Sequence, residues 1–144
     1  MYKHILIATD GSELGTKGID HGLKLAKTCG AKVYILTVTD VWSAGALATA
    51  GPATIAEYDT ALRSAVTDIL KQAAGFAEAA GVQYQTRHLP NRYPADAIVE
   101  TAQSQGCDLI VMASHGRRGF RRMLLGSQTT EVLTASTIPV LVVR

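Results

Sequence analysis

The sequence alternates between short apolar runs and stretches with helical periodicity, and this alternation constrains the fold more than any other feature. Apolar runs typical of strands occupy residues 5–8, 33–38, 84–89, 109–113 and 140–143. The intervening helices are predicted from Ser12 to Gly30, Ile55 to Gly81, Pro94 to Gly106 and Ser127 to Ala135. Such an order favours one parallel sheet covered by helices on both faces. The sequence therefore predicts a single α/β domain over residues 1–144, with three α/β/α layers.

Two segments depart from the regular pattern. Residues 84–89 are more polar than the other strand-like runs, and this polarity suits the edge of the sheet. Residues 39–54 contain Gly, Pro and small side chains without a sustained period, so we expect a loop or lid there, with Trp42 packed on it.

Charge and cysteine content narrow the class of protein. A net charge of +2 gives no overall field that would hold the chain on nucleic acid or on anionic lipid, and no apolar run is long enough for a membrane helix. Cys29 and Cys107 lie in apolar segments without metal-binding spacing. We expect both thiols to be buried and reduced, in a cytoplasmic protein without nucleic-acid or membrane partners.

The stretch MASHGRRGFRRMLLGS, residues 112–127, lies where a ligand is expected. In parallel α/β sheets, ligands bind beyond the carboxyl ends of the strands, at the point where the strand order reverses. This rule selects Thr9–Asp10, the region after Val38 and residues 114–119. Met112 and the pair Leu124–Leu125 are expected in the core.

Three chemistries compete for this stretch. Ser114 precedes a glycine as in a nucleophile elbow, but the adjacent His115 does not fit the chain order of a hydrolase triad. Four arginines could contact nucleic acid, yet no aromatic series accompanies them; they are Arg117, Arg118, Arg121 and Arg122. A phosphate cradle accounts for more of the residues. Gly116 and Gly119 permit positive φ and close approach, and Gly126–Ser127 begins a helix whose N–H groups favour an anion.

The same stretch resembles the ATP-binding branch of the universal stress protein family, whose motif is Gly-x2-Gly-x9-Gly-Ser/Thr. Here the motif reads Ala113, Gly116 and Gly126–Ser127. The resemblance extends along the chain through ILIATDGS, VYILTV, VMASHG, LLGS and IPVLVV. Two departures are Ala113 in place of the first glycine and Gln128, which could add a phosphate contact or crowd one.

The resemblance implies a Rossmann-like, five-stranded parallel sheet in the order 3-2-1-4-5 that binds ATP, with Mg²⁺ on the phosphates and Asp10 as a possible metal ligand. It also implies a homodimer through the C-terminal strand Val140–Val143. The implied nucleotide-binding residues are Ala8, Thr9, Asp10, Val38, Met112, Ala113, Ser114, His115, Gly116, Arg117, Arg118, Gly119, Gly126, Ser127, Gln128 and Thr129.

The motif and the resemblance favour a protein that regulates the stress response in a nucleotide-dependent way, rather than an enzyme that turns over a metabolite. For His115, a structural role or a place beside the phosphates is preferred to general base chemistry, because no carboxylate partner is identifiable. Slow ATP hydrolysis or phosphoryl transfer, a nucleotide-free interaction module, and binding of AMP or cyclic AMP remain alternatives.

Overall fold

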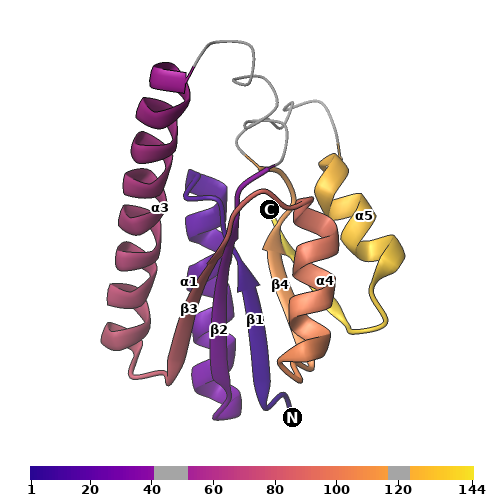
Figure 1. Ribbon diagram of the computed structural model, residues 1–144. Coiled ribbons are helices and arrows are strands. Elements are labelled where there is room, and N and C mark those ends of the chain that lie inside the picture. The colour runs from indigo at the N-terminus through magenta and orange to yellow at the C-terminus, as the bar shows by residue number, and fades with distance from the viewer. Residues whose placement is uncertain (41–51, 117–123) are drawn as a thin grey trace.

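The computed structural model describes residues 1–40, 52–116 and 124–144 as one three-layer α/β/α domain (Figure 1). All pairings in its five-stranded sheet are parallel, and the strand order is β3-β2-β1-β4-β5, as predicted. The strands are β1 (His4–Ala8), β2 (Lys32–Val38), β3 (Tyr84–Leu89), β4 (Leu109–Ala113) and β5 (Val140–Val143). The helices are α1 (Glu13–Cys29), α3 (Pro52–Ala80), α4 (Pro94–Ser104) and α5 (Ser127–Ala135).

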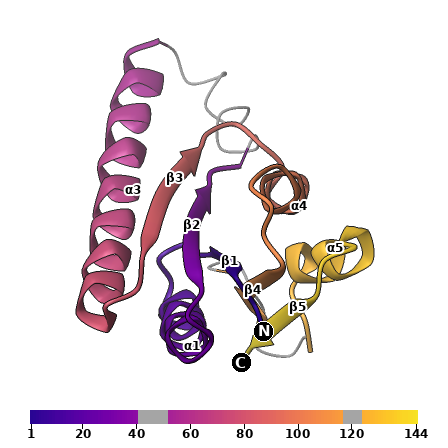
Figure 2. The ribbon, with the colours of Figure 1, turned by 90° about the horizontal axis from the view of Figure 1, so that it is seen from below.

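The helices form two layers, with α1 and α3 on one face of the sheet and α4 and α5 on the other (Figure 2). Alternate residues of each strand supply the two cores, because successive side chains of a strand point to opposite faces. In β1, Ile5 and Ile7 pack under α1, whereas Leu6 packs with Ile98 of α4. All three β1 side chains are fully buried, so β1 is the centre of the domain.

The ends of α1 follow the signals in the sequence. Ser12 is the N-cap, and its Oγ accepts a hydrogen bond from the backbone N–H of Gly15 at 3.0 Å. Gly30 ends the helix with a φ of 67°, a left-handed conformation that glycine adopts without steric cost. The register of β1 against β2 is therefore fixed by a helix with two well-defined ends.

The polar strand β3 lies at one edge of the sheet and β5 lies at the other. This position confirms the interpretation of residues 84–89 as an edge strand. On the face that carries α3, β3 is covered; on the opposite face α4 lies nearer to β2 (Figure 2). The outer part of that face is consequently open.

Three sequence expectations need correction. The predicted loop at 39–54 ends earlier, because α3 already begins at Pro52, a residue that the first helical turn tolerates. Cys107 is buried but Cys29, next to the end of α1, is only half-buried. Leu124 is not in the core: it is 78% exposed, since it stands before the turn that starts α5. Met112 is buried as predicted. Trp42 lies outside the described residues.

None of the helices in the described part of the chain is both long enough and apolar enough to cross a membrane.

Candidate functional site

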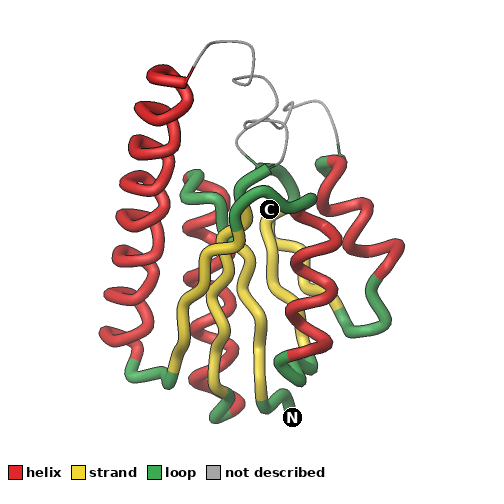
Figure 3. The backbone as a smooth tube through the Cα atoms, viewed as in Figure 1, coloured by secondary structure: helices red, strands yellow, loops and turns green. Residues whose placement is uncertain are grey.

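The carboxyl ends of all five strands lie at one edge of the sheet, where the chain turns into loops and helices (Figure 3). β1 and β4 are neighbours there, with Ile7 paired to Val111. The chain leaves β1 for α1 on one face and leaves β4 for α5 on the other face. Such a divergence at the carboxyl ends of neighbouring strands is the position at which open α/β sheets bind ligands.

The turn after β1 is held by its own side chains. Oδ1 of Asp10 accepts a hydrogen bond from the N–H of Ser12 at 3.0 Å. Gly11 has a φ of 77°, so the turn depends on the left-handed conformation there. Thr9 is buried, and its carbonyl oxygen accepts from the hydroxyl of Thr37 at 3.0 Å. Asp10 is thus fixed at the mouth of the divergence.

The turn after β4 and the start of α5 meet directly. The N–H of Gly126 donates to the carbonyl oxygen of Ser114 over 2.7 Å. The hydroxyl of Thr129 donates to the carbonyl oxygens of Ala113 and Ser114, at 2.9 and 3.1 Å. The two bends that the motif predicts are therefore joined by three hydrogen bonds. Because the Thr129 hydroxyl donates to the backbone, its main-chain N–H is the better candidate for contact with a ligand.

Gly116 lies against the β1 turn. A Cβ atom added to Gly116 would be 3.0 Å from Oδ2 of Asp10. Its φ lies outside the left-handed region, which corrects the expectation that positive φ requires glycine here. A side chain at this position would instead press on the Asp10 carboxylate, which would have to shift to make room. Ala113, at the first motif position, also avoids positive φ, so its methyl group is accommodated.

The N-terminus of α5 offers unpaired donors to an anion. Its N-cap is Gly126, which has no side chain to accept from the first turn. The first N–H groups of a helix have no partner inside the helix, and the helix dipole favours negative charge there. Ser127 is exposed at this end. The N–H groups of residues 127–129 can therefore donate hydrogen bonds to phosphate oxygens.

Gln128 has a role that the sequence did not reveal. Its Oε1 accepts a hydrogen bond from the N–H of Ala95, in the first turn of α4, at 3.0 Å. The N-cap of α4 is Tyr93, which makes no side-chain cap bond, and Pro94 follows it. Gln128 thus caps α4 from α5, and its Oε1 is engaged by Ala95.

His115 packs beside the cradle. Its Nδ1 lies 3.1 Å from Oγ of Ser114, and a Cβ atom on Gly126 would be 3.4 Å from its Cα. Its Nε2 is buried and has no hydrogen-bond partner among the described residues. A structural role for His115, or a place beside the phosphates, stays a prediction.

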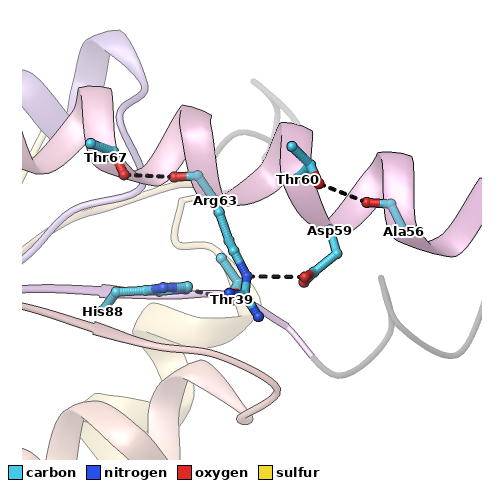
Figure 4. Close-up of polar contacts among 7 residues, drawn as sticks. All are labelled: Thr39, Ala56, Asp59, Thr60, Arg63, Thr67 and His88. Atoms are coloured by element: carbon cyan, nitrogen blue, oxygen red, sulfur yellow. Dashed lines mark hydrogen bonds and ion pairs between the residues drawn. The ribbon is translucent and has the colours of Figure 1, made fainter.

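The ends of β2 and β3 form the far side of the site. Val38 pairs with Leu89, and the N–H of Thr39 donates to the carbonyl oxygen of Leu89 at 3.0 Å. Figure 4 shows His88 and Thr39 pointing toward each other, with Nε2 and Oγ1 2.9 Å apart, while Arg63 reaches down from α3.

The Thr39–His88 contact was not predicted, because no motif marks it. Burial, and secondarily the charge of Arg63, lower the pKa of His88. Arg63 is paired with Asp59 at 3.0 Å (Figure 4).

The remaining predicted residues are placed as follows. Ala8 is half-buried at the end of β1. The phosphate-side residues Arg117, Arg118 and Gly119 lie outside the described residues, as do Arg121 and Arg122. Within the described ranges, no group of three or more His, Cys, Asp or Glu side chains is arranged to hold a metal ion.

Comparison with known proteins identifies the family. The sequence profile of the universal stress protein family matches residues 1–144. The chain belongs to the universal stress protein family. Universal stress protein MJ0531 of Methanocaldococcus jannaschii is 36% identical over 144 residues, which are 100% of this chain and 83% of that protein.

Solved structures of family members share the architecture. Hypothetical protein MJ0577, also from Methanocaldococcus jannaschii, superposes with a TM-score of 0.85 and 29% identity, covering 99% of this chain and 96% of that one. A universal stress protein crystallised in complex with cAMP superposes with a TM-score of 0.72 and 28% identity, over 99% and 97% of the two chains. The five-stranded sheet in the order 3-2-1-4-5 is thus the family fold.

Proposed function

We propose that this universal stress protein binds an adenine nucleotide, ATP with Mg²⁺ in the first instance, across the carboxyl ends of β1 and β4. The observation that carries the proposal is the convergence of the two glycine turns, in which Gly126 bonds to Ser114 and Gly116 lies against Asp10. A cradle of this kind presents backbone N–H groups to a chain of anionic oxygens.

Each part of the site has a role in this proposal. The first turn of α5 and the turn at Ser114–Gly116 bind the phosphates, with His115 beside them. Asp10 lies near the ribose or the phosphate-bound metal, and the Val38 backbone meets the adenine. The described residues of this site supply no clear water-orienting group for hydrolysis. The site therefore acts by binding, and nucleotide occupancy regulates the stress response.

A cyclic or monophosphate nucleotide is the second candidate, because a related family member is crystallised with cAMP. A ligand with one phosphate would engage the adenine and ribose contacts and fewer N–H groups of α5. The loss of the outer phosphates predicts weaker binding if the cradle dominates the affinity.

Isothermal titration with Mg-ATP, AMP and cAMP tests both candidates. We expect Mg-ATP to bind best, and Gly116→Val to weaken it at least about tenfold, because the added side chain meets the Asp10 carboxylate. Gly75→Ala is the matched control, since a Cβ atom at Gly75 meets nothing within 4 Å. Absence of binding at millimolar nucleotide would remove the proposal, and tighter binding of cAMP would favour the second candidate.

The homodimer belongs to the same proposal. β5 is an edge strand whose Leu141 side chain is exposed, and an unpaired edge is a ready template for another strand. Sedimentation of the wild type against Leu141→Lys tests it: a dimer that becomes a monomer supports pairing through β5, and two identical profiles contradict it.

A further inference from the structure

A second concave surface lies on the open outer part of the sheet, away from the nucleotide cradle. This groove has a volume of about 460 Å³ and runs between β2, β3 and α4. It exists because α4 lies nearer to β2 than to β3 on this face (Figure 2). Its lining includes Tyr34, Arg87, Arg92, Thr101 and Ser104.

The register of the sheet directs Arg87 into this groove. Arg87 pairs with Leu36 in the adjacent parallel strand. Leu36 packs in the core beneath α4, and paired residues of neighbouring strands lie on the same face of a sheet. Within the described residues, no carboxylate forms an ion pair with Arg87. The guanidinium therefore contributes uncompensated positive charge to the groove.

Two hydroxyl groups that line the groove have no hydrogen-bond partner among the described residues, although their residues are largely buried. Tyr34 is 8% exposed and Thr101 is 9% exposed. Among the described residues, none hydrogen-bonds either side chain, and neither oxygen is among the side-chain atoms sealed from the surface. His4 holds the Tyr34 ring edge-on, with ring centroids 6.4 Å apart. Both oxygens therefore reach the surface of the groove, where they can donate to a bound ligand.

Arg92 closes the end of the groove nearest the loops and is itself anchored. Its Nη2 is paired with Oε2 of Glu100 in α4, and its backbone N–H donates to the carbonyl oxygen of Thr39 at 3.2 Å. Arg92 and Glu100 compensate each other. The charge that remains in the lining is that of Arg87.

We propose that this groove binds the phosphate of a small phosphate monoester. Arg87 of β3, the Tyr34 hydroxyl of β2 and the Thr101 hydroxyl of α4 approach it from three elements. A phosphate has three terminal oxygens that accept from different directions, whereas a carboxylate has two in one plane. The site goes beyond the proposed nucleotide function and shares no residue with it.

Amide chemical shifts of the full-length chain, titrated with glucose 6-phosphate, test the proposal. We expect saturable shifts at Arg87, Thr101 and Gln105 at millimolar ligand, smaller ones with inorganic phosphate, and none with glucose. Tyr34→Phe with Thr101→Val removes only the hydroxyls, and Arg87→Gln removes the charge. Each should weaken binding about tenfold, while Arg63→Gln on α3 should bind as the wild type does.

The outcomes separate this site from the nucleotide cradle. Gly116→Val alters the cradle and should leave the groove titration unchanged, whether or not nucleotide binds. Shifts confined to residues 114–116 and 126–129, equal binding by wild type and both groove variants, or equal shifts with glucose would each overturn the proposal.

Discussion

The backbone nitrogen of Gly126 lies 2.7 Å from the carbonyl oxygen of Ser114, so the N-cap residue of α5 is hydrogen-bonded to the first residue after β4. Eleven residues, 115–125, lie between these two, and seven of them, 117–123, lie outside the described ranges. The hydrogen bond fixes where both ends of that segment stand. The geometry of the cradle therefore depends on this closure and on the two hydrogen bonds that the Thr129 hydroxyl donates to Ala113 and Ser114.

Gly126→Ala should disturb the closure by contact alone. The φ of Gly126 is −70°, which any residue adopts, but a Cβ atom there would lie 3.2 Å from the Ser114 oxygen and 3.4 Å from Cα of His115. We expect a loss of about 1 kcal/mol in the free energy of unfolding and weaker nucleotide binding. Urea denaturation and calorimetric titration measure the two effects. If neither the free energy of unfolding nor the nucleotide affinity changes, contact between the two turns matters for neither stability nor binding.

Gln128→Leu should destabilise the fold while leaving the proposed nucleotide site nearly intact. The substitution removes the acceptor that caps the Ala95 N–H, and loss of a helix cap costs about 0.5–2 kcal/mol. Nucleotide affinity should change by less than about threefold, because the backbone N–H of residue 128 is retained. A large loss of affinity at unchanged stability would instead place the side chain on the ligand.

Glycine to alanine changes at two helical positions should have opposite signs. At Gly75 in α3 the added methyl group meets nothing within 4 Å, so Gly75→Ala should stabilise by about 0.5–1 kcal/mol through helix propensity. At Gly22 in α1 the same methyl group would lie 2.5 Å from Cδ1 of Ile7, so Gly22→Ala should destabilise by about 1–3 kcal/mol. Thermal unfolding of the two variants beside the wild type measures both.

His4 should make stability fall with acidification. Burial, and secondarily the charge of Lys32, lower the pKa of His4 below 6.5, its ordinary value. Above that value both the folded and unfolded states are neutral at this site. As the pH falls below it, the unfolded chain takes up the proton first, and the folded state loses stability until the folded pKa is passed.

Urea unfolding at pH 7.5 and pH 5 tests this prediction. The two pH values lie roughly one unit or more above and below the ordinary pKa of histidine. His4→Gln should lose less stability between the two conditions than the wild type does. His88, whose pKa is also lowered, provides a second contribution that His4→Gln retains. If the wild type and His4→Gln lose equal stability between the two pH values, the pH dependence arises from groups other than His4.

The two thiols should differ in reactivity. Burial raises the pKa of Cys107 to about 11, with a further contribution from Asp108. At pH 8 about one Cys107 in a thousand is then a thiolate, the reactive form. Iodoacetamide followed by peptide mapping should label the half-buried Cys29 first. Labelling of Cys107 in urea provides the control, and fast labelling of Cys107 in the native protein would contradict the prediction.

The order of elements could be predicted from sequence because each one carries a local signal. Ser12 and Gly30 bracket α1, apolar runs mark the strands, and the polarity of 84–89 identifies an edge. The meeting of Gly126 with Ser114 followed from the topology, since the turns after β4 and before α5 share one edge of the sheet. Whether nucleotide binds there stays a prediction.

Contacts between side chains that are distant in sequence could not be predicted. Gln128 reaches Ala95 across 33 positions, and the choice between that bond and a phosphate depends on how α4 and α5 pack. The same holds for His88 and Thr39, which meet because β2 and β3 end together. Of the two properties predicted for Gly116, the left-handed φ is wrong and the close approach is present, to the Asp10 carboxylate.

The carbonyl oxygen of Val143 accepts a hydrogen bond from the N–H of Ser114 at 2.8 Å. The last strand, β5, is therefore bonded directly to the first residue of the cradle. In a parallel sheet the residues before β1 leave from the opposite rim, and Figure 1 shows the two ends of the chain far apart. An affinity tag or a fluorophore attached after Arg144 would lie at the same rim of the sheet as the proposed nucleotide site. Labels for titration work belong on Met1.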